Sequence, residues 1–212
     1  STSGAFTLSV ICNTPPPNDL CSGAITVTCG QTVMGNTSFA SPDPAAGVCG
    51  DGSTGTSPGV WYSFVGNNQG VTISTCGNAT WDTQLFAYTG TCAGLACVAG
   101  NDDDCGVQST ISFFAQSGVT YYILVRGFGT ASGAFSFTVQ CTPLMFSYLD
   151  PCRCNNDAGF SQTNGTFSEQ VVITGPPGIT NLGATVTINA SACVGLSPAI
   201  PCTPTPPSVT SL

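Results

Sequence analysis

The chain has 212 residues and a formal net charge of −8, with no histidine and only two Lys or Arg residues. This negative charge repels phosphate backbones and excludes nucleic-acid binding. Without histidine, Ser-His-Asp and Cys-His catalysis is excluded, and without lysine so is Schiff-base chemistry, which predicts a protein that is not an enzyme.

The first predicted element is a strand in residues 1–12, STSGAFTLSVIC, where Phe6, Leu8 and Val10 alternate with small polar residues. Residues 130–141, TASGAFSFTVQC, repeat it with Ser, Gly, Ala, Phe, Val and Cys in register. A lone strand cannot bury its apolar face, so this segment needs a partner. Residues 13–18 contain three consecutive prolines and are expected to form a stiff, extended linker.

Three explanations of the repeated strand stay open. The chain is a piece of a tandem array that begins inside a preceding repeat, or the strand folds back within its own chain. In the third explanation, which we favour, the strand leaves its subunit and completes a sheet of a neighbouring copy. Such head-to-tail contacts do not close on themselves and build filaments.

Residues 19–143 predict one all-β domain. No segment has a 3.6-residue apolar period, and seven β-rich runs are separated by Gly, Asn, Asp and Pro. This pattern is typical of an antiparallel β-sandwich or jelly roll. The runs are AITVTC, GVWYSFVG, GVTISTC, TQLFAYTG, STISFFAQ, TYYILVRGF and GAFSFTVQC.

Aromatic residues mark the run GVWYSFVG as a central strand. Val60, Tyr62 and Phe64 fall on one face and Trp61 on the other, which suits a strand buried on both faces. We expect Trp61 to pack in a core, with sugar stacking as the alternative. Whether Trp81, which follows the turn CGNAT, is exposed stays open.

Three consecutive carboxylates, Asp102, Asp103 and Asp104, follow a predicted strand. They repel one another unless solvent or a cation compensates. Oxygen ligands on a loop suit Ca²⁺, to which Asp82 would contribute from a neighbouring strand end. The alternative is a solvated turn with Asx-type hydrogen bonds. No other cofactor is predicted.

Residues 144–202 predict a second, smaller β-sandwich-like unit with candidate strands in LMFSYLD, GTFSEQVVITG and GATVTINASAC. Three strands are few for a sandwich, so this unit or an open edge of the first domain is the expected acceptor of a neighbour's strand. Residues 203–212 read as a Pro/Thr-rich tail. No apolar run approaches the ~18 residues of a membrane span.

Thirteen cysteines indicate an oxidising compartment, and a zinc site is disfavoured because histidine and repeated CxxC pairs are lacking. Cys92 and Cys97 bracket the stretch AGLA and are expected to bridge locally. Cys193 and Cys202 are expected to close a Pro-rich loop. The odd count leaves at least one thiol free or bonded to another chain. Four sequons mark candidate glycan sites at Asn36, Asn78, Asn164 and Asn189.

The segment from Asn18 to Cys141 resembles the PPC (pre-peptidase C-terminal) domain family of bacterial secreted and surface proteins. The matching pieces are NDLCSGA (18–24), GVWYSF (59–64), WDTQLFAYTG (81–90), NDDDC (101–105), GVTYYILVRGF (118–128) and GAFSFTVQC (133–141). The resemblance implies a β-sandwich that serves as an accessory module without catalytic residues, and some relatives bind calcium. Residues 150–178 resemble a small β module of large bacterial surface proteins.

Together, these patterns favour a non-catalytic structural or adhesive subunit at the cell surface or outside the cell. It would polymerise head to tail with copies of itself by strand donation. The alternative is a carbohydrate-binding or accessory module of a larger secreted bacterial protein or enzyme, with glycans as partners.

Overall fold

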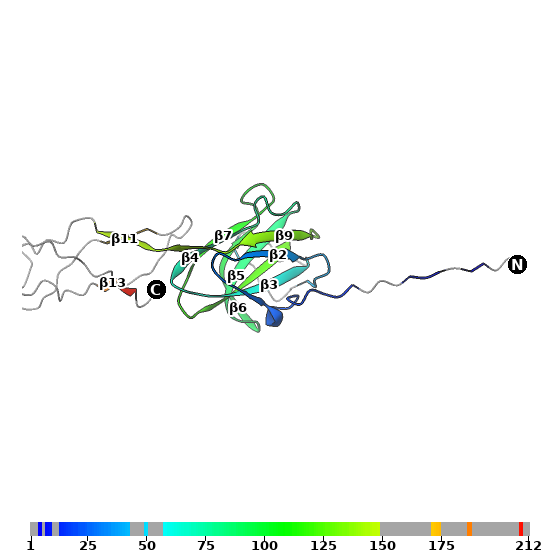
Figure 1. Ribbon diagram of the computed structural model, residues 1–212, viewed down its shortest axis with the longest axis horizontal. Helices are drawn as coiled ribbons and strands as arrows, with labels where there is room; N and C mark the ends of the chain where they lie inside the picture. Colours follow the sequence, from blue (N-terminus) through cyan, green and yellow to red (C-terminus); the bar gives the residue numbers. More distant parts are fainter. Residues whose placement is uncertain are drawn as a thin grey trace, which may run out of the picture.

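The computed structural model describes residues 4–5, 7–9, 13–42, 49–50 and 57–148, and short strands at 171–174, 186–187 and 208–209. Figure 1 shows a β-sandwich from which the N-terminal segment leads away. Within the described part of the chain, the only helical element is a 3-10 turn, η1 (Cys21–Gly23). The prediction of an all-β sandwich is therefore confirmed.

One layer is a five-stranded sheet. Its strands, in spatial order, are β1 (Ile25–Val27), β3 (Gly59–Val65), β8 (Thr120–Gly127), β5 (Thr83–Thr91) and β6 (Gly94–Asn101). All neighbours are antiparallel except β1 and β3, which run parallel. The prediction of antiparallel pairing is therefore wrong for these two strands. The chain leaves β1, passes through a strand of the other layer and returns, and such a crossover gives parallel neighbours.

The other layer contains two paired groups of strands. β2 (Thr32–Asn36) pairs with β9 (Ala134–Thr138), and β4 (Gln69–Ser74) lies between β10 (Gln140–Pro143) and β7 (Thr110–Ala115). β9 runs into β10 with one residue between them. The amide of Ser136 in β9 also donates to the carbonyl of Asn78, just after β4, at 3.0 Å. Through these contacts the strands of this layer lie side by side, in the order β2, the continuous pair β9 and β10, β4 and β7.

The main core lies between the two layers. Alternate residues of the strands point into it, because successive side chains of a strand lie on opposite faces of the sheet. Its members come from both layers: Val27, Val33, Val60, Tyr62, Phe64, Val71, Ile73, Leu85, Ile111, Phe113, Ile123, Val125, Phe135, Phe137 and Val139. Tyr62 meets Phe137 edge to face, with ring centroids 5.1 Å apart.

A second, smaller core covers the outer face of the five-stranded sheet. Trp61, Phe86, Tyr88 and Leu124 are buried there together with Cys49. Trp61 is 1% exposed, and its ring centroid is 6.0 Å from that of Tyr88. Val60, Tyr62 and Phe64 face the main core, so the prediction of a strand buried on both faces is confirmed.

Four disulfides cross-link the described part of the chain: Cys21–Cys92, Cys29–Cys141, Cys49–Cys97 and Cys76–Cys105. The expected local bridge between Cys92 and Cys97 is wrong. The stretch AGLA is a turn and the start of β6, with Gly94 opposite Thr91. Cys97 lies three residues further along the strand, roughly 10 Å at 3.3 Å per residue, beyond the reach of a disulfide. The expected bridge between Cys193 and Cys202 lies outside the described residues.

Three of the described strands, β2, β6 and β14 (Ser208–Val209), lie outside the runs named in the sequence analysis. β2 and β6 complete their sheets. After residue 144, β11 (Met145–Tyr148) pairs antiparallel with β12 (Val171–Thr174). β13 (Val186–Thr187) pairs with β14, which falls in the expected tail.

A membrane-crossing helix is not found in the described residues: none of the helical structure there has the length and apolar character that a span requires.

Candidate functional site

The acidic residues meet at one end of the β5–β6 hairpin. Asp82 directly precedes β5, and Asp102 and Asp103 directly follow β6. Because the two strands are antiparallel, with Leu85 opposite Asn101, the start of β5 and the end of β6 share one edge. One carboxylate oxygen from each of Asp82, Asp102 and Asp103 lies within 4.8 Å of the other two.

The charge of Asp82 is poorly compensated. Burial raises the pKa of the Asp82 carboxyl above its ordinary value, and the negative charges of Asp102 and Asp103 raise it further. Its Oδ1 atom is buried and accepts no hydrogen bond from the described part of the chain. A cation at this point would relieve both the repulsion and the missing partner.

Buried hydroxyl groups hold the backbone of this cluster. The hydroxyl groups of Thr75 and Thr83 are hydrogen-bonded at 2.6 Å. The Ser109 hydroxyl donates to the carbonyl groups of Thr83 and Asp102. Thr75, Thr83 and Ser109 are fully buried, and the Cys76–Cys105 disulfide closes the following loop. The carboxylates therefore project from a fixed backbone.

The donor set fits a hard cation. Calcium takes oxygen ligands at about 2.3–2.6 Å, so two ligands on opposite sides of the ion lie about 5 Å apart. The three carboxylate oxygens fall within that span. Asp104 does not belong to the group; its backbone amide donates to the Gln108 carbonyl at 2.9 Å in the next turn. The sequence grouped four carboxylates, and the structure brings three of them together.

The two tryptophans occupy different environments. Trp61 lies in the second core, as expected, and offers no exposed ring. Trp81 is half-buried: its Nε1–H donates to the Ala134 carbonyl at 2.8 Å, and its ring packs edge to face on Phe135.

Two of the four sequons lie in the described part of the chain. Asn36 and Asn78 are both exposed. They lie on either side of β9, because Asn36 is opposite Ala134 and the Asn78 carbonyl accepts from the Ser136 amide. Glycan attachment at either stays a prediction, and Asn164 and Asn189 lie outside the described residues.

The N-terminal strand is described only in part. Leu8 is 76% exposed, whereas Phe6 and Val10 lie outside the described residues. Residues 4–5 and 7–9 are exposed and make no hydrogen bond with the rest of the described chain.

The sequence analysis overlooked an open sheet edge and a buried arginine. β2 pairs only with β9 among the described strands, and Met34 in its middle is 85% exposed. Arg126 is fully buried; its Nε–H donates to Gln84 Oε1 at 3.0 Å and its guanidinium lies 4.6 Å from the Phe86 ring centroid. A single arginine inside the apolar run YYILVRGF was the available signal for the second feature.

The fold and these features define a disulfide-stapled β-sandwich of the kind found in oxidising compartments. No protein-family model matches the chain, and no curated protein matches it significantly. Among solved structures, the chain is similar to the 1.0 Å crystal structure of the pre-peptidase C-terminal domain of collagenase from Bacillus anthracis. The match has 16% identity and a TM-score of 0.36, and it covers 60% of this chain and 100% of that domain.

Proposed function

We propose that the chain is a non-catalytic structural subunit that works outside the cell and joins copies of itself head to tail. The joint is the N-terminal strand, which leaves its own subunit and completes a sheet of the next one. The observation that carries this proposal is the repeat of β9 at the start of the chain, compared with the surroundings of the two copies.

The apolar residues of the two copies differ in burial. The counterparts of Phe6, Leu8 and Val10 are buried core residues: Phe135 is 4% exposed, Phe137 1% and Val139 0%. Leu8 itself is 76% exposed. Leu8, part of a segment with the apolar pattern of a core strand, thus lies in solvent in a single chain, and a neighbouring copy would supply the missing core.

The aligned glycines of the two strands also support a contact between copies. A Cβ atom added to Gly133 would lie 2.8 Å from Cδ1 of Trp81, so close packing requires glycine there. The aligned Gly4 has nothing within 4 Å of an added Cβ in its own chain. Close packing of the strand against another copy would account for glycine at this position too.

The length of the linker and the apolar residues of the strand are compatible with such a joint. Residues 13–18 span at most ~20 Å when extended, which reaches an adjoining subunit. Burying Phe6, Leu8 and Val10 would contribute ~1.5–3 kcal/mol each, to which a ladder of backbone hydrogen bonds is added. Four disulfides in the described residues and a low content of charged residues, 6%, suit a durable fibre outside the cell.

The test is a pair of charge-matched double variants of the full chain. Phe6→Asp with Val10→Asp places charges on the apolar face, and it should leave the sandwich folded but abolish assembly. Asn13→Asp with Thr14→Asp adds the same charge to the linker, outside the apolar strand, and should still assemble. Negative-stain microscopy and sedimentation measure the outcome. If the first variant forms fibres of the wild-type length and symmetry, the strand is not the connector.

The carbohydrate-binding alternative has a separate discriminator. Trp61 is buried, so it offers no stacking platform in this structure. Monomers that bind a glycan array and form no fibres would favour the alternative over the structural subunit.

A calcium site at Asp82, Asp102 and Asp103 is our second proposal. The three converging oxygens and the uncompensated buried Oδ1 of Asp82 support it. A bound ion stabilises only the folded state, so EDTA should lower the melting temperature and added Ca²⁺ should restore it. A melt that is unchanged in both conditions would favour the solvated turn.

A further inference from the structure

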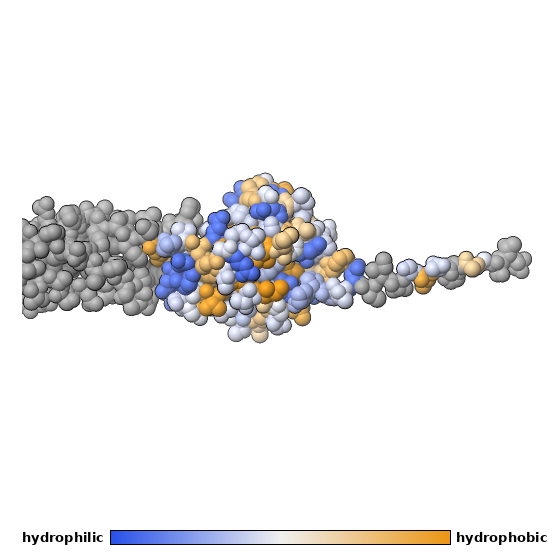
Figure 2. All heavy atoms as spheres, in the orientation of Figure 1, coloured by the Kyte–Doolittle hydropathy of each residue, from blue (hydrophilic) through white to orange (hydrophobic). Residues whose placement is uncertain are grey.

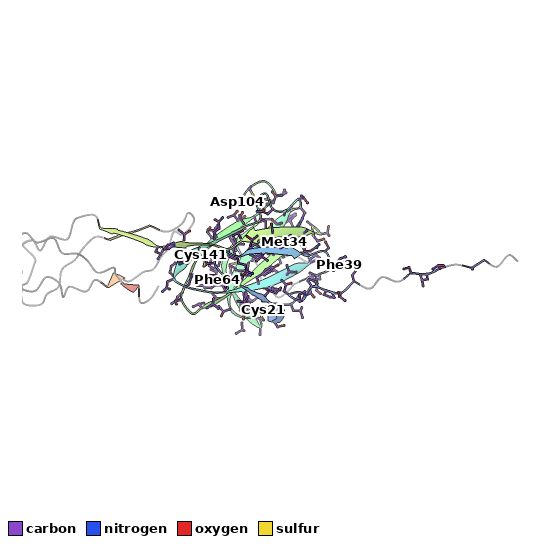
Figure 3. The ribbon with its side chains drawn as sticks, in the orientation of Figure 1. Cys21, Met34, Phe39, Phe64, Asp104 and Cys141 are labelled. Carbon is purple, nitrogen blue, oxygen red and sulfur yellow. A yellow bond between two sulfur atoms is a disulfide. The ribbon has the colours of Figure 1, made fainter. Side chains whose placement is uncertain are left out.

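We propose that the acceptor of the N-terminal strand is the open edge of β2 in a second copy of the chain, where residues 4–12 add as an antiparallel strand. This inference rests on the proposed function and names its partner surface. Figure 3 labels Met34 in the middle of this edge, and Figure 2 shows the same face with hydrophobic residues scattered among hydrophilic ones.

The hydrogen-bond register shows which backbone groups of β2 face outward. The Thr37 amide donates to the Gly133 carbonyl, and the Val139 amide donates to the Gln31 carbonyl. Hydrogen-bonded pairs alternate along an antiparallel ladder, so Val33 and Gly35 also bond to β9. The amides and carbonyls of Thr32, Met34 and Asn36 therefore point away from β9, towards the open edge.

Contacts cover part of each of the other two long sheet edges in the described residues. On β7, the Thr110 amide donates to Asn101 Oδ1 at 3.0 Å, and the Phe114 carbonyl accepts from the Tyr121 hydroxyl at 3.2 Å. On β6, the backbone of Cys49 lies against Gly100, where an added Cβ would be 2.0 Å from the Cys49 carbonyl oxygen.

β1 is also an edge strand, but it has only three residues. By contrast, β2 has five residues, and Met34 in its middle is 85% exposed. No hydrogen bond from the described residues reaches the outward amides and carbonyls of β2, so this edge can accept a strand from another molecule.

The repeat explains why the N-terminal strand suits this edge. On β9, Ala134, Ser136 and Thr138 lie opposite Asn36, Met34 and Thr32, and the Thr32 and Thr138 hydroxyl groups bond at 2.9 Å. In the repeat these positions are Ala5, Thr7 and Ser9.

The same small and hydroxyl side chains can thus form the same cross-strand pairs on the other side of β2. In this register, Phe6 and Leu8 lie opposite Gly35 and Val33. Their side chains then fall on the face that β2 turns towards the core.

A second copy is the partner because of where the N-terminal segment leads. Its described residues, 4–5 and 7–9, lie away from their own sandwich, beyond the proline-rich linker (Figure 1). Neither the donor strand nor β2 carries a charged residue, so no charge within the two strands opposes their pairing.

The test is proline at an outward-facing position. Met34→Pro in the full chain removes an amide that points to the open edge. The amides of Val33 and Gly35, which donate to β9, are unchanged. Edge strands tolerate proline at such positions. We expect Met34→Pro to keep its disulfides and its melting transition but to lose assembly. Met34→Thr keeps the amide while removing the exposed methionine, and it should assemble.

Hydrogen exchange gives a second readout that does not depend on any variant. In the unassembled wild-type protein, the amides of Thr32, Met34 and Asn36 should exchange fast and those of Val33 and Gly35 slowly. In the assembled protein all five should exchange slowly. An unprotected Met34 amide in assembled material overturns the inference, and this readout decides the question if Met34→Pro fails to fold.

The two proposals fail in distinguishable ways. If Phe6→Asp with Val10→Asp blocks assembly while folded Met34→Pro assembles normally, strand donation stands and the acceptor is not β2. If neither change affects assembly, both proposals fall.

Discussion

Cys29 and Cys141 join the two layers of the sandwich: Cys29 follows β1 of the five-stranded sheet, and Cys141 lies in β10 of the facing layer. Their Cα atoms are 5.5 Å apart, although 112 residues separate them in sequence. The bridge therefore links the beginning and the end of the domain. It also fixes the chain next to the point where β9 ends.

Removing this bridge should cost more stability than removing a short-range one. The double variant Cys29→Ser with Cys141→Ser is expected to lose about 2–5 kcal/mol of unfolding free energy, because cross-linking a longer loop restricts the unfolded chain more. Cys76→Ser with Cys105→Ser opens a separation of only 29 residues and should lose less. Urea denaturation of both variants measures the difference, and an equal loss would contradict the loop-length argument.

Trp61 should contribute to stability and not to ligand binding. Trp61→Ala removes a fully buried indole from the second core and should lower the unfolding free energy by about 3–5 kcal/mol. Val98→Ala, at a position that is 38% exposed, is the control and should have a small effect. A Trp61→Ala protein with wild-type stability would show that the second core does not stabilise the sheet.

The composition of the runs made much of this fold predictable from sequence. The seven expected runs all contain strands, because each is rich in β-branched or aromatic residues and turn-forming residues separate the runs. The aromatic run GVWYSFVG even predicted the two cores, one on each face of β3. The proximity of Asp82 to Asp102 and Asp103 followed from their places at neighbouring strand ends.

The missed features depend on small residues and on tertiary contacts. β2, TVMGN, and β6, GLACVAGN, contain glycine and few large side chains, so their local pattern does not distinguish strand from loop. They become strands because β9 and β5 pair with them. Disulfide pairing follows from the same tertiary arrangement, so the spacing of Cys92 and Cys97 could not reveal that each bonds a distant cysteine.

Asp82 provides a direct test of the calcium proposal. Without a cation, Asp82→Asn removes an unfavourable, half-buried charge, so in EDTA at neutral pH the variant should melt at or above the wild-type temperature. With Ca²⁺ the order should reverse, because the variant loses a ligand. Asp104→Asn, outside the group of three, should keep the wild-type response to Ca²⁺. Differential scanning calorimetry measures all three proteins, and an equal gain for Asp82→Asn would exclude this carboxylate as a ligand.

The pH dependence of the cation-free protein follows from the raised pKa of Asp82. The folded state binds this proton more tightly than the unfolded state, so the ionised carboxylate is destabilising above the raised pKa. The cost disappears as the pH falls through that pKa. In EDTA, the melting advantage of Asp82→Asn over the wild type should therefore shrink from pH 7 to pH 4. An advantage that grows towards acid would have the wrong sign for a raised pKa.

The two aligned glycines should respond differently to alanine. Gly133→Ala places a Cβ 2.8 Å from the Trp81 ring and should lower monomer stability by about 1–3 kcal/mol. Gly94→Ala, where an added Cβ has nothing within 4 Å, is the control for the loss of a glycine.

Gly4→Ala should leave the melting temperature of the unassembled protein unchanged, because an added Cβ meets nothing within 4 Å. If the N-terminal strand packs closely against a neighbouring copy, the extra methyl group must still find space in the assembled state. We expect the critical concentration for assembly to rise about tenfold, the equivalent of about 1.4 kcal/mol at the joint. Light scattering across a dilution series measures this concentration. A Gly4→Ala protein that assembles at the wild-type concentration would mean that the joint leaves this position open to solvent.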